Sequence, residues 1–177
     1  MPGCWRTSDS PTEDSRAGCV LAEVNGHEIV FSFLDPVKGR GAEIQRLDVA
    51  GGIVDWSLSP DGTRIAIGDP NSNGWIRILT IVDHRVVPLQ RYKSWAMVQR
   101  IAWAADGKHL FATAWSNEDP GGFQAILSLD FQGHAEVIEK IVAGAGWLED
   151  MRASPDGHYL AYTKRNFESK VMLLENF

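Results

Sequence analysis

The sequence is poor in cysteine, with only Cys4 and Cys19 among 177 residues. Two cysteines are too few for a disulfide framework or a four-ligand metal site. A bridge between them would close a small loop across a polar segment. Because nothing in the sequence indicates secretion, two unrelated thiols are favoured over a bridge.

The chain also lacks an excess of basic residues and long apolar runs. Lysine and arginine number 17 against 23 aspartates and glutamates, a formal net charge of -6. Non-specific nucleic-acid binding relies on clustered lysine and arginine, so no nucleic-acid partner is expected. No apolar run approaches the roughly 20 residues of a membrane helix, and residues 12–16 are polar where a signal peptide would be apolar. We expect a cytoplasmic location for the chain as given, or a periplasmic one within a longer membrane-anchored protein.

Helical periodicity is missing as well: no segment repeats apolar residues at helix spacing over ten or more positions. What the sequence has instead is a recurrent turn. It reads Ser59-Pro60-Asp61-Gly62, Ala104-Ala105-Asp106-Gly107 and Ser154-Pro155-Asp156-Gly157, and Asn25-Gly26 marks a fourth copy. Each lies between two strand-like runs, and Asp-Gly and Asn-Gly favour tight hairpins because glycine adopts positive φ without steric cost. The three Asp-Gly pairs are 45 and then 50 residues apart, which is typical of propeller blades.

The repeats predict an all-β fold, a β-propeller portion of about four antiparallel blades with the terminal two incomplete. We expect the blades at residues 19–50, 51–92, 95–142 and 146–177, after a disordered polar tail at 1–18. Outer strands are expected at residues 85–89 and 135–141 of the second and third copies, whereas the outer strand of the first copy is expected to be very short or missing. In the last copy, residues 170–175 are expected to form the third strand. A single blade cannot bury its own faces, so Trp56 and Trp103 are expected to pack between blades.

The turns carry a family resemblance. Ser59-Pro60-Asp61-Gly62 and Ser154-Pro155-Asp156-Gly157 resemble the hairpin motif of PD40 or TolB-type WD40-like propellers, and the copy at Ala104 keeps its last two residues. Residues 34–41, 104–108 and 174–177 are also similar to the C-terminal propeller region of acidobacterial multidomain proteins. In those proteins the propeller follows a serine/threonine kinase or a winged-helix domain. This resemblance implies a sensory or scaffolding propeller attached to a signalling output.

Two local patterns could carry chemistry. Asp69, Asn71 and Asn73 match the first half of a calcium-binding loop, but Thr80 stands where the bidentate glutamate should be. A polar loop between strands is therefore the favoured interpretation, and no metal or other cofactor is expected. Ser59 and Ser154 lie beside Asp61 and Asp156, but their recurrence at turns indicates a structural role. With no Gly-x-Ser-x-Gly motif, the sequence predicts no enzyme.

The remaining candidates are aromatic residues in loops: Tyr92, Trp95, Trp115 and Trp147. Tyrosine and tryptophan with charged neighbours are typical of binding hot spots, although these rings could equally fold back onto the blades. We expect a non-catalytic module for protein–protein interaction or ligand sensing. The alternative is a propeller accessory to a hydrolase or peptidase, without an active site of its own. The expected partner is another protein or a second copy of the chain in a homodimer, because an open wedge would expose blade faces and an edge.

Overall fold

A computed structural model describes residues 3–5, 18–51, 54–69, 76–89, 94–116, 122–142 and 146–166. Over these ranges the chain forms fourteen strands and no helix, in four antiparallel sheets. The predicted all-β fold is confirmed. No helix that could span a membrane occurs in this part of the chain.

The strands follow one another along the chain, and neighbours in sequence are neighbours in each sheet. Sheet I contains β1 (Gly3–Trp5), β2 (Gly18–Asn25), β3 (Glu28–Asp35) and β4 (Gly39–Asp48). Sheet II contains β5 (Asp55–Leu58), β6 (Arg64–Gly68), β7 (Ile76–Thr80) and β8 (Val86–Pro88). Sheet III contains β9 (Trp95–Trp103), β10 (His109–Ser116), β11 (Phe123–Asp130) and β12 (Ala135–Val142). Sheet IV contains β13 (Trp147–Ala153) and β14 (Leu160–Arg165). The third strand expected at 170–175 lies outside the described residues.

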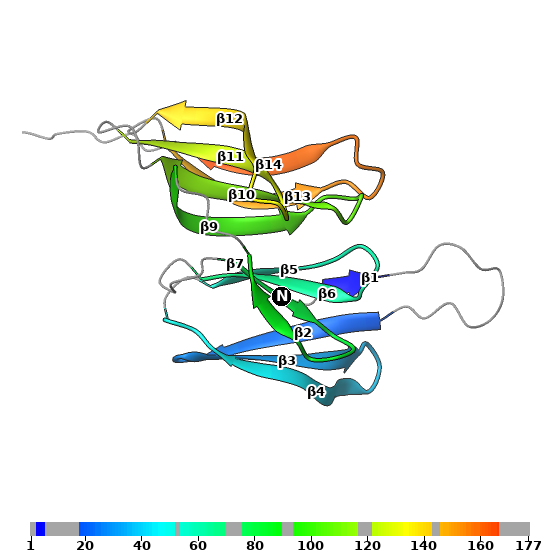
Figure 1. Ribbon diagram of the computed structural model, residues 1–177. Coiled ribbons are helices and arrows are strands. Elements are labelled where there is room, and N and C mark those ends of the chain that lie inside the picture. The colour runs from blue at the N-terminus through cyan, green and yellow to red at the C-terminus, as the bar shows by residue number, and fades with distance from the viewer. Residues whose placement is uncertain are drawn as a thin grey trace, which may run out of the picture.

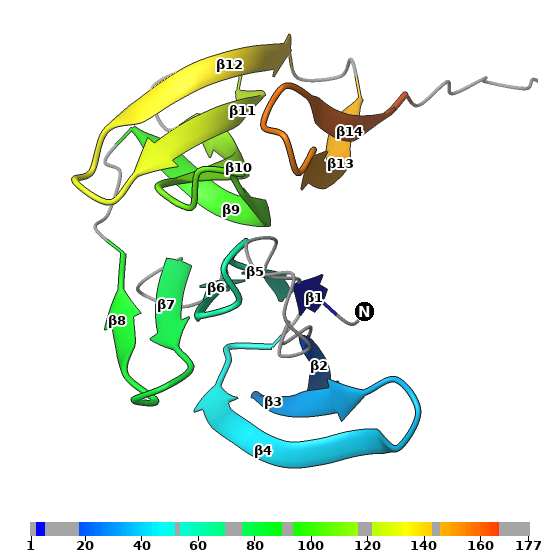
Figure 2. The same cartoon turned by 90° about the vertical axis from the view of Figure 1, so that its right-hand side faces the viewer.

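The sheets look stacked in Figure 1, and the view turned by 90° shows that the four follow one another in an arc (Figure 2). Viewed from the side, β1, β5, β9 and β13 face the middle of the arc, while β4, β8 and β12 lie at its periphery (Figure 2). Each sheet is a meander that starts near the centre and runs outward, and none closes on itself. This arrangement brings strands from different sheets together at the centre.

The recurrent turns form hairpins in which the glycine adopts the expected positive φ. Ser59 Oγ donates to Asp61 Oδ1 at 2.5 Å and accepts the Arg64 N–H at 2.9 Å. Gly62 adopts φ 70° and donates to the Ser59 carbonyl. Ser154 repeats both side-chain bonds with the same lengths. These contacts confirm that the serines and aspartates are structural.

Apolar side chains fill the spaces between sheets. Phe31 of sheet I meets Trp56 of sheet II edge to face, with ring centroids 5.5 Å apart. Trp103 of sheet III is buried and donates from Nε1 to the Ser57 carbonyl of sheet II. Between sheets III and IV, Leu148 and Met151 are buried. Burial of such side chains contributes about 1.5–3 kcal/mol each, so neighbouring sheets stabilise one another. The expectation that Trp56 and Trp103 pack between repeats is confirmed.

The N-terminal segment differs from the sequence-based expectation. Gly3–Trp5 forms β1, which pairs with β2, and Cys4 lies directly opposite Cys19 in the register. The two cysteines form a disulfide with their Cα atoms 4.0 Å apart. Two unrelated thiols was therefore the wrong choice, because cross-strand pairing brings together cysteines that are 15 residues apart in sequence. The predicted polar tail likewise contains a strand at residues 3–5, while residues 6–17 lie outside the described ranges.

The outward face of sheet I is covered by ion pairs. Arg40 contacts Glu23 at 2.7 Å, and Arg46 contacts Glu28 at 2.9 Å and Glu43 at 3.2 Å. At the other end of the arc, Arg165 contacts Glu149 of sheet IV at 2.9 Å. Both end sheets therefore carry charged side chains on the faces that point away from their neighbours.

Candidate functional site

The inner strands of all four sheets surround a cavity of about 450 Å³. Such concave sites with apolar walls and a few convergent polar groups are the usual binding sites of proteins. The lining residues come from β1, β2, β5, β9 and β13 and from the approach to β5: Cys4, Ala22, Val24, Val54, Asp55, Trp56, Ser57, Leu58, Arg100, Asp150 and Arg152.

One wall is built by hydrogen bonds between sheets II and III. Asp55 Oδ2 accepts the Ile101 N–H at 2.9 Å, and Ser57 Oγ accepts the Trp103 N–H at 3.1 Å. Burial raises the pKa of Asp55, and this effect exceeds the opposing influence of the Ile101 N–H and of the Arg100 charge. The cavity wall is thus held in place by its own side chains, with one desolvated carboxyl among them.

The cationic groups of the cavity come from two other strands. Arg100 lies on β9, where its backbone N–H donates to Thr113 Oγ1 at 3.1 Å. Arg152 lies on β13, and its Nη1 donates to the Met151 carbonyl at 2.8 Å. The register of β13 shifts between Glu149 and Met151, where Asp150 adopts φ 34°. Leu148 and Met151, on either side of this bulge, are both buried, while Asp150 and Arg152 line the cavity.

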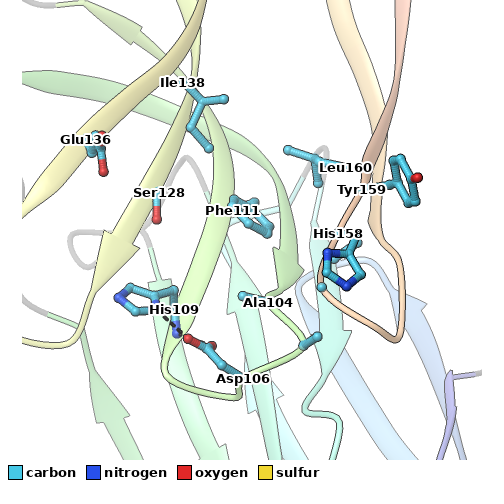
Figure 3. Close-up of a pocket in the computed structure, with 13 residues that line it drawn as sticks. Ala104, Asp106, His109, Phe111, Ser128, Glu136, Ile138, His158, Tyr159 and Leu160 are labelled. Carbon is cyan, nitrogen blue, oxygen red and sulfur yellow. Dashed lines mark hydrogen bonds and ion pairs between the residues drawn. The ribbon is translucent and has the colours of Figure 1, made fainter.

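A second hollow of about 520 Å³ lies between sheets III and IV (Figure 3). Phe111 and Ile138 line it from sheet III, and Leu160 lines it from sheet IV. Two of its ionic groups are engaged with each other: His109 Nδ1 lies 2.8 Å from Asp106 Oδ2, drawn as the dashed contact in Figure 3. Burial raises the pKa of Asp106, but hydrogen bonds from Lys108 and His109 outweigh it, so the pKa is lowered overall. We take the inner cavity as the site because its arginines are not occupied in this way.

Three of the four aromatic residues predicted to bind a partner, Trp95, Trp115 and Trp147, lie within the described residues. Trp95 opens β9 and is 8% exposed, with its ring packed against Phe123 at 5.8 Å, so it is not on a loop surface. Trp115 and Trp147 meet edge to face at 6.1 Å across sheets III and IV, and Trp147 is 45% exposed. Tyr92 lies outside the described residues. Only the Trp115–Trp147 pair is brought together.

Of the three candidate calcium ligands, only Asp69 lies within the described residues. Asp69 is 1% exposed; its Oδ2 accepts the Ala50 N–H at 2.9 Å and lies 3.8 Å from Arg77 Nη2. Its carboxylate is therefore turned toward protein donors. Asn71 and Asn73 lie outside the described ranges. No group of three histidine, cysteine or acidic side chains suited to a metal occurs in the part of the chain that is described.

Sequence reasoning missed Asp55, Arg100, Asp150 and Arg152. A signal for three of them was present, because Asp55, Arg100 and Asp150 each stand six positions before the aspartate of a recurrent turn. Cys19 holds the matching position before Asn25. Aligned repeats place equivalent residues at equivalent points of each sheet, so one column of the alignment marks the cavity. Arg152 lies two residues further along its strand.

Comparison with known proteins shows which solved structures have a similar fold. No protein-family model matches the sequence, and no curated protein matches it. Among solved structures, TolB from Acinetobacter baumannii superposes with a TM-score of 0.65 at 19% identity, over 96% of this chain and 39% of TolB. Hydrazine synthase from Kuenenia stuttgartiensis gives 0.59 at 18% identity, over 99% of this chain and 47% of that one.

The periplasmic gluconolactonase of Pseudomonas aeruginosa gives a TM-score of 0.52 at 16% identity, over 83% of this chain and 47% of the lactonase. The chain thus spans less than half the length of each of these proteins. At these identities the likeness concerns the fold alone, which is TolB-like and of the propeller type.

Proposed function

We propose that the chain is a non-catalytic propeller module with about four blades, which recognises a protein partner through the cavity between its inner strands. One observation carries this proposal: Arg100 and Arg152, from two different sheets, line one cavity together with aliphatic, aromatic and acidic side chains. Arginine beside aliphatic and aromatic groups is the composition of protein-binding hot spots. The Trp115–Trp147 pair offers a second contact area at one end of sheets III and IV.

The alternative remains a propeller accessory to a hydrolase or peptidase. The gluconolactonase among the similar structures is an enzyme, so the fold is compatible with both functions. In both cases we expect the chain itself to be non-catalytic, because Ser59 and Ser154, the candidate nucleophiles, use their hydroxyls to hold hairpins. Purified protein should release no product from lactone or peptide substrates, and turnover that Asp55→Asn abolishes would contradict a non-catalytic module.

We further propose that the module is the sensory or scaffolding part of a bacterial signalling protein. The support is the resemblance of residues 34–41, 104–108 and 174–177 to propellers that follow a kinase or winged-helix domain. Sequencing of the gene tests the idea directly. A kinase or winged-helix segment upstream supports it, whereas a Gly-x-Ser-x-Gly domain supports the hydrolase alternative.

The Cys4–Cys19 disulfide favours the periplasmic location over the cytoplasmic one. Disulfides persist in oxidising compartments and are rare where glutathione and thioredoxin keep thiols reduced. Alkylation of cells under native conditions, followed by mass measurement of the protein, should find both cysteines protected. Alkylation of both would place the chain in a reducing compartment.

A second copy of the chain is the other candidate partner. Sheet I offers its Arg40–Glu23 and Arg46–Glu28 pairs, which could exchange with those of another molecule. Light scattering during size exclusion measures the mass. A dimer that dissociates at high salt would support pairing through these charges, and a monomer would leave a different protein as the partner.

The cavity itself is tested by filling it. Val24 lines the cavity and is 47% exposed, so Val24→Arg should fold and obstruct it. Val37→Arg is the matched control, since Val37 is 93% exposed and does not line the cavity. Selection from a random octapeptide library displayed on phage should yield binders for the wild type and the control. Val24→Arg should reduce their affinity at least tenfold (about 1.4 kcal/mol); unchanged affinity would place the site elsewhere.

A further inference from the structure

Outside the cavity, most arginines of the described chain have a partner for the guanidinium group, and Arg85 in the turn before β8 is the exception. Ion pairs with a carboxylate are made by Arg40, Arg46, Arg77 and Arg165. Arg64 lies over the Trp103 ring at 4.6 Å and donates to the Gly107 carbonyl. Within the described residues, neither Arg100 nor Arg152 makes an ion pair, although both line a cavity that also contains Asp55 and Asp150.

The reason lies in how the carboxylates are held. Asp55 Oδ2 is committed to the Ile101 N–H on the neighbouring strand. Asp150 sits on the bulge of β13 and is exposed. Arg152 Nη1 donates one hydrogen bond to the Met151 carbonyl. Most of the five N–H donors of this guanidinium group therefore remain for other contacts. The two guanidinium groups therefore keep donor capacity for a ligand.

We propose that Arg100 and Arg152 together bind a carboxylate, and that the ligand is an acidic peptide segment of the partner protein. This inference rests on the proposed binding function and names the chemistry of its ligand. The planar guanidinium group presents paired N–H donors that match the two oxygens of a carboxylate. Arginines from β9 and β13 approach the ligand from two sheets, which fixes its orientation as well as its charge.

The rest of the cavity selects a peptide with an apolar residue beside the acidic one. Ala22, Val24 and Leu58 provide aliphatic walls, and Trp56 provides an aromatic one. Ser57 is the lining hydroxyl, and its oxygen already accepts the Trp103 N–H. A sugar acid would have no apolar side chain to place against these walls, whereas such a peptide would bury one there. A doubly charged phosphate would meet the two aspartates, whereas a singly charged carboxylate suffers less repulsion.

The test uses the same random octapeptide library, selected against the full wild-type chain and against Arg100→Gln/Arg152→Gln. Glutamine keeps a polar side chain of similar reach but removes the charge. Arg85→Gln is the matched control, since Arg85 lies in the turn before β8 and outside this cavity. Peptides selected by the wild type and by the control should be enriched in aspartate or glutamate next to leucine, isoleucine, valine or an aromatic residue. Replacement of that acid by its amide should lower the affinity at least tenfold, and the double variant should show no such difference.

The outcomes separate this inference from the proposed function. The selected peptides could lack acid enrichment and still lose their binding to Val24→Arg. That result would keep the cavity as the binding site but would contradict a carboxylate as its ligand. Acid-enriched peptides that bind the double variant as tightly as the wild type would also overturn it. In another outcome no peptide binds, and oligogalacturonate raises the Tm of the wild type but not of the double arginine variant. The ligand would then be a sugar acid, and the proposal of a peptide ligand would be wrong. No binding of either probe would overturn both proposals.

Discussion

The indole Nε1 of Trp103 donates a hydrogen bond to the carbonyl oxygen of Ser57 at 3.0 Å, across the junction of sheets II and III. Trp103→Phe keeps the buried ring but removes the donor, which leaves a part-buried carbonyl without its partner. We expect the free energy of unfolding to fall by about 1–3 kcal/mol. Trp103→Ala should cost about 3–5 kcal/mol, because it also creates a cavity. Urea denaturation measures both changes. Tyr159→Phe is the control, since Tyr159 is 75% exposed and should change stability by less than about 0.5 kcal/mol.

Asp55 should reduce stability at neutral pH, because burial is the largest influence on its pKa and raises it. Above that raised pKa the folded state holds a desolvated charge, while below the unfolded value of about 3.9 the carboxyl is neutral in both states. Asp55→Asn keeps an oxygen for the Ile101 N–H and removes the charge. Its Tm should exceed that of the wild type by about 1–4 °C at pH 7, and the difference should vanish below about pH 4. A lower Tm for the variant at pH 7 would show that the nearby arginines outweigh the burial.

Strand β1 should depend on the Cys4–Cys19 bridge. The strand has only three residues, and so short a strand pairs weakly without a crosslink. Closing a loop of this length contributes about 3 kcal/mol in the chain-entropy model. Dithiothreitol should therefore lower the unfolding free energy of the wild type by up to that amount, measured by urea denaturation. The double variant Cys4→Ser/Cys19→Ser should match the reduced protein and ignore the reductant. Equal stability of the oxidised and reduced wild type would show that β1 unfolds independently of the sheets.

The two full copies of the turn should differ in their sensitivity to mutation. Ser59 and Ser154 make the same pair of hydrogen bonds, but Ser59 is 2% exposed, whereas the bonds of Ser154 lie at the surface. Ser59→Ala should cost about 1–3 kcal/mol because water cannot replace the lost bonds. Ser154→Ala should cost less than about 1 kcal/mol, since water reaches its partners. Equal losses in thermal or urea unfolding would show that burial does not set the strength of this turn.

Much of the fold could be predicted because its determinants are local. The turn residues place the hairpins, and the run between Gly62 and the next turn contains β6, β7 and β8 as expected. The outer strands predicted at 85–89 and 135–141 correspond to β8 and β12. By contrast, β1 was assigned to a disordered tail, because three residues carry no periodicity and their pairing partner begins at Gly18.

The candidate site was harder to predict because it belongs to no single segment. The sequence places Trp95 in a loop, but the side chain is buried because it packs against Phe123 of another strand. The cavity residues Asp55, Arg100 and Arg152 lie on three strands of three sheets. Individually they look like ordinary polar residues at strand positions.

Local sequence was sufficient to predict the hairpins, the repeat and every described strand except β1, since Asp-Gly turns and apolar alternation act over a few residues. Which residues meet at the centre of the arc depends on how the sheets pack. Packing of the sheets places the inner strands side by side, joins Cys4 to Cys19, and leaves two arginines facing a cavity. Burial, ionisation and ligand access depend on neighbours that are distant along the chain, so local pattern could not reveal them.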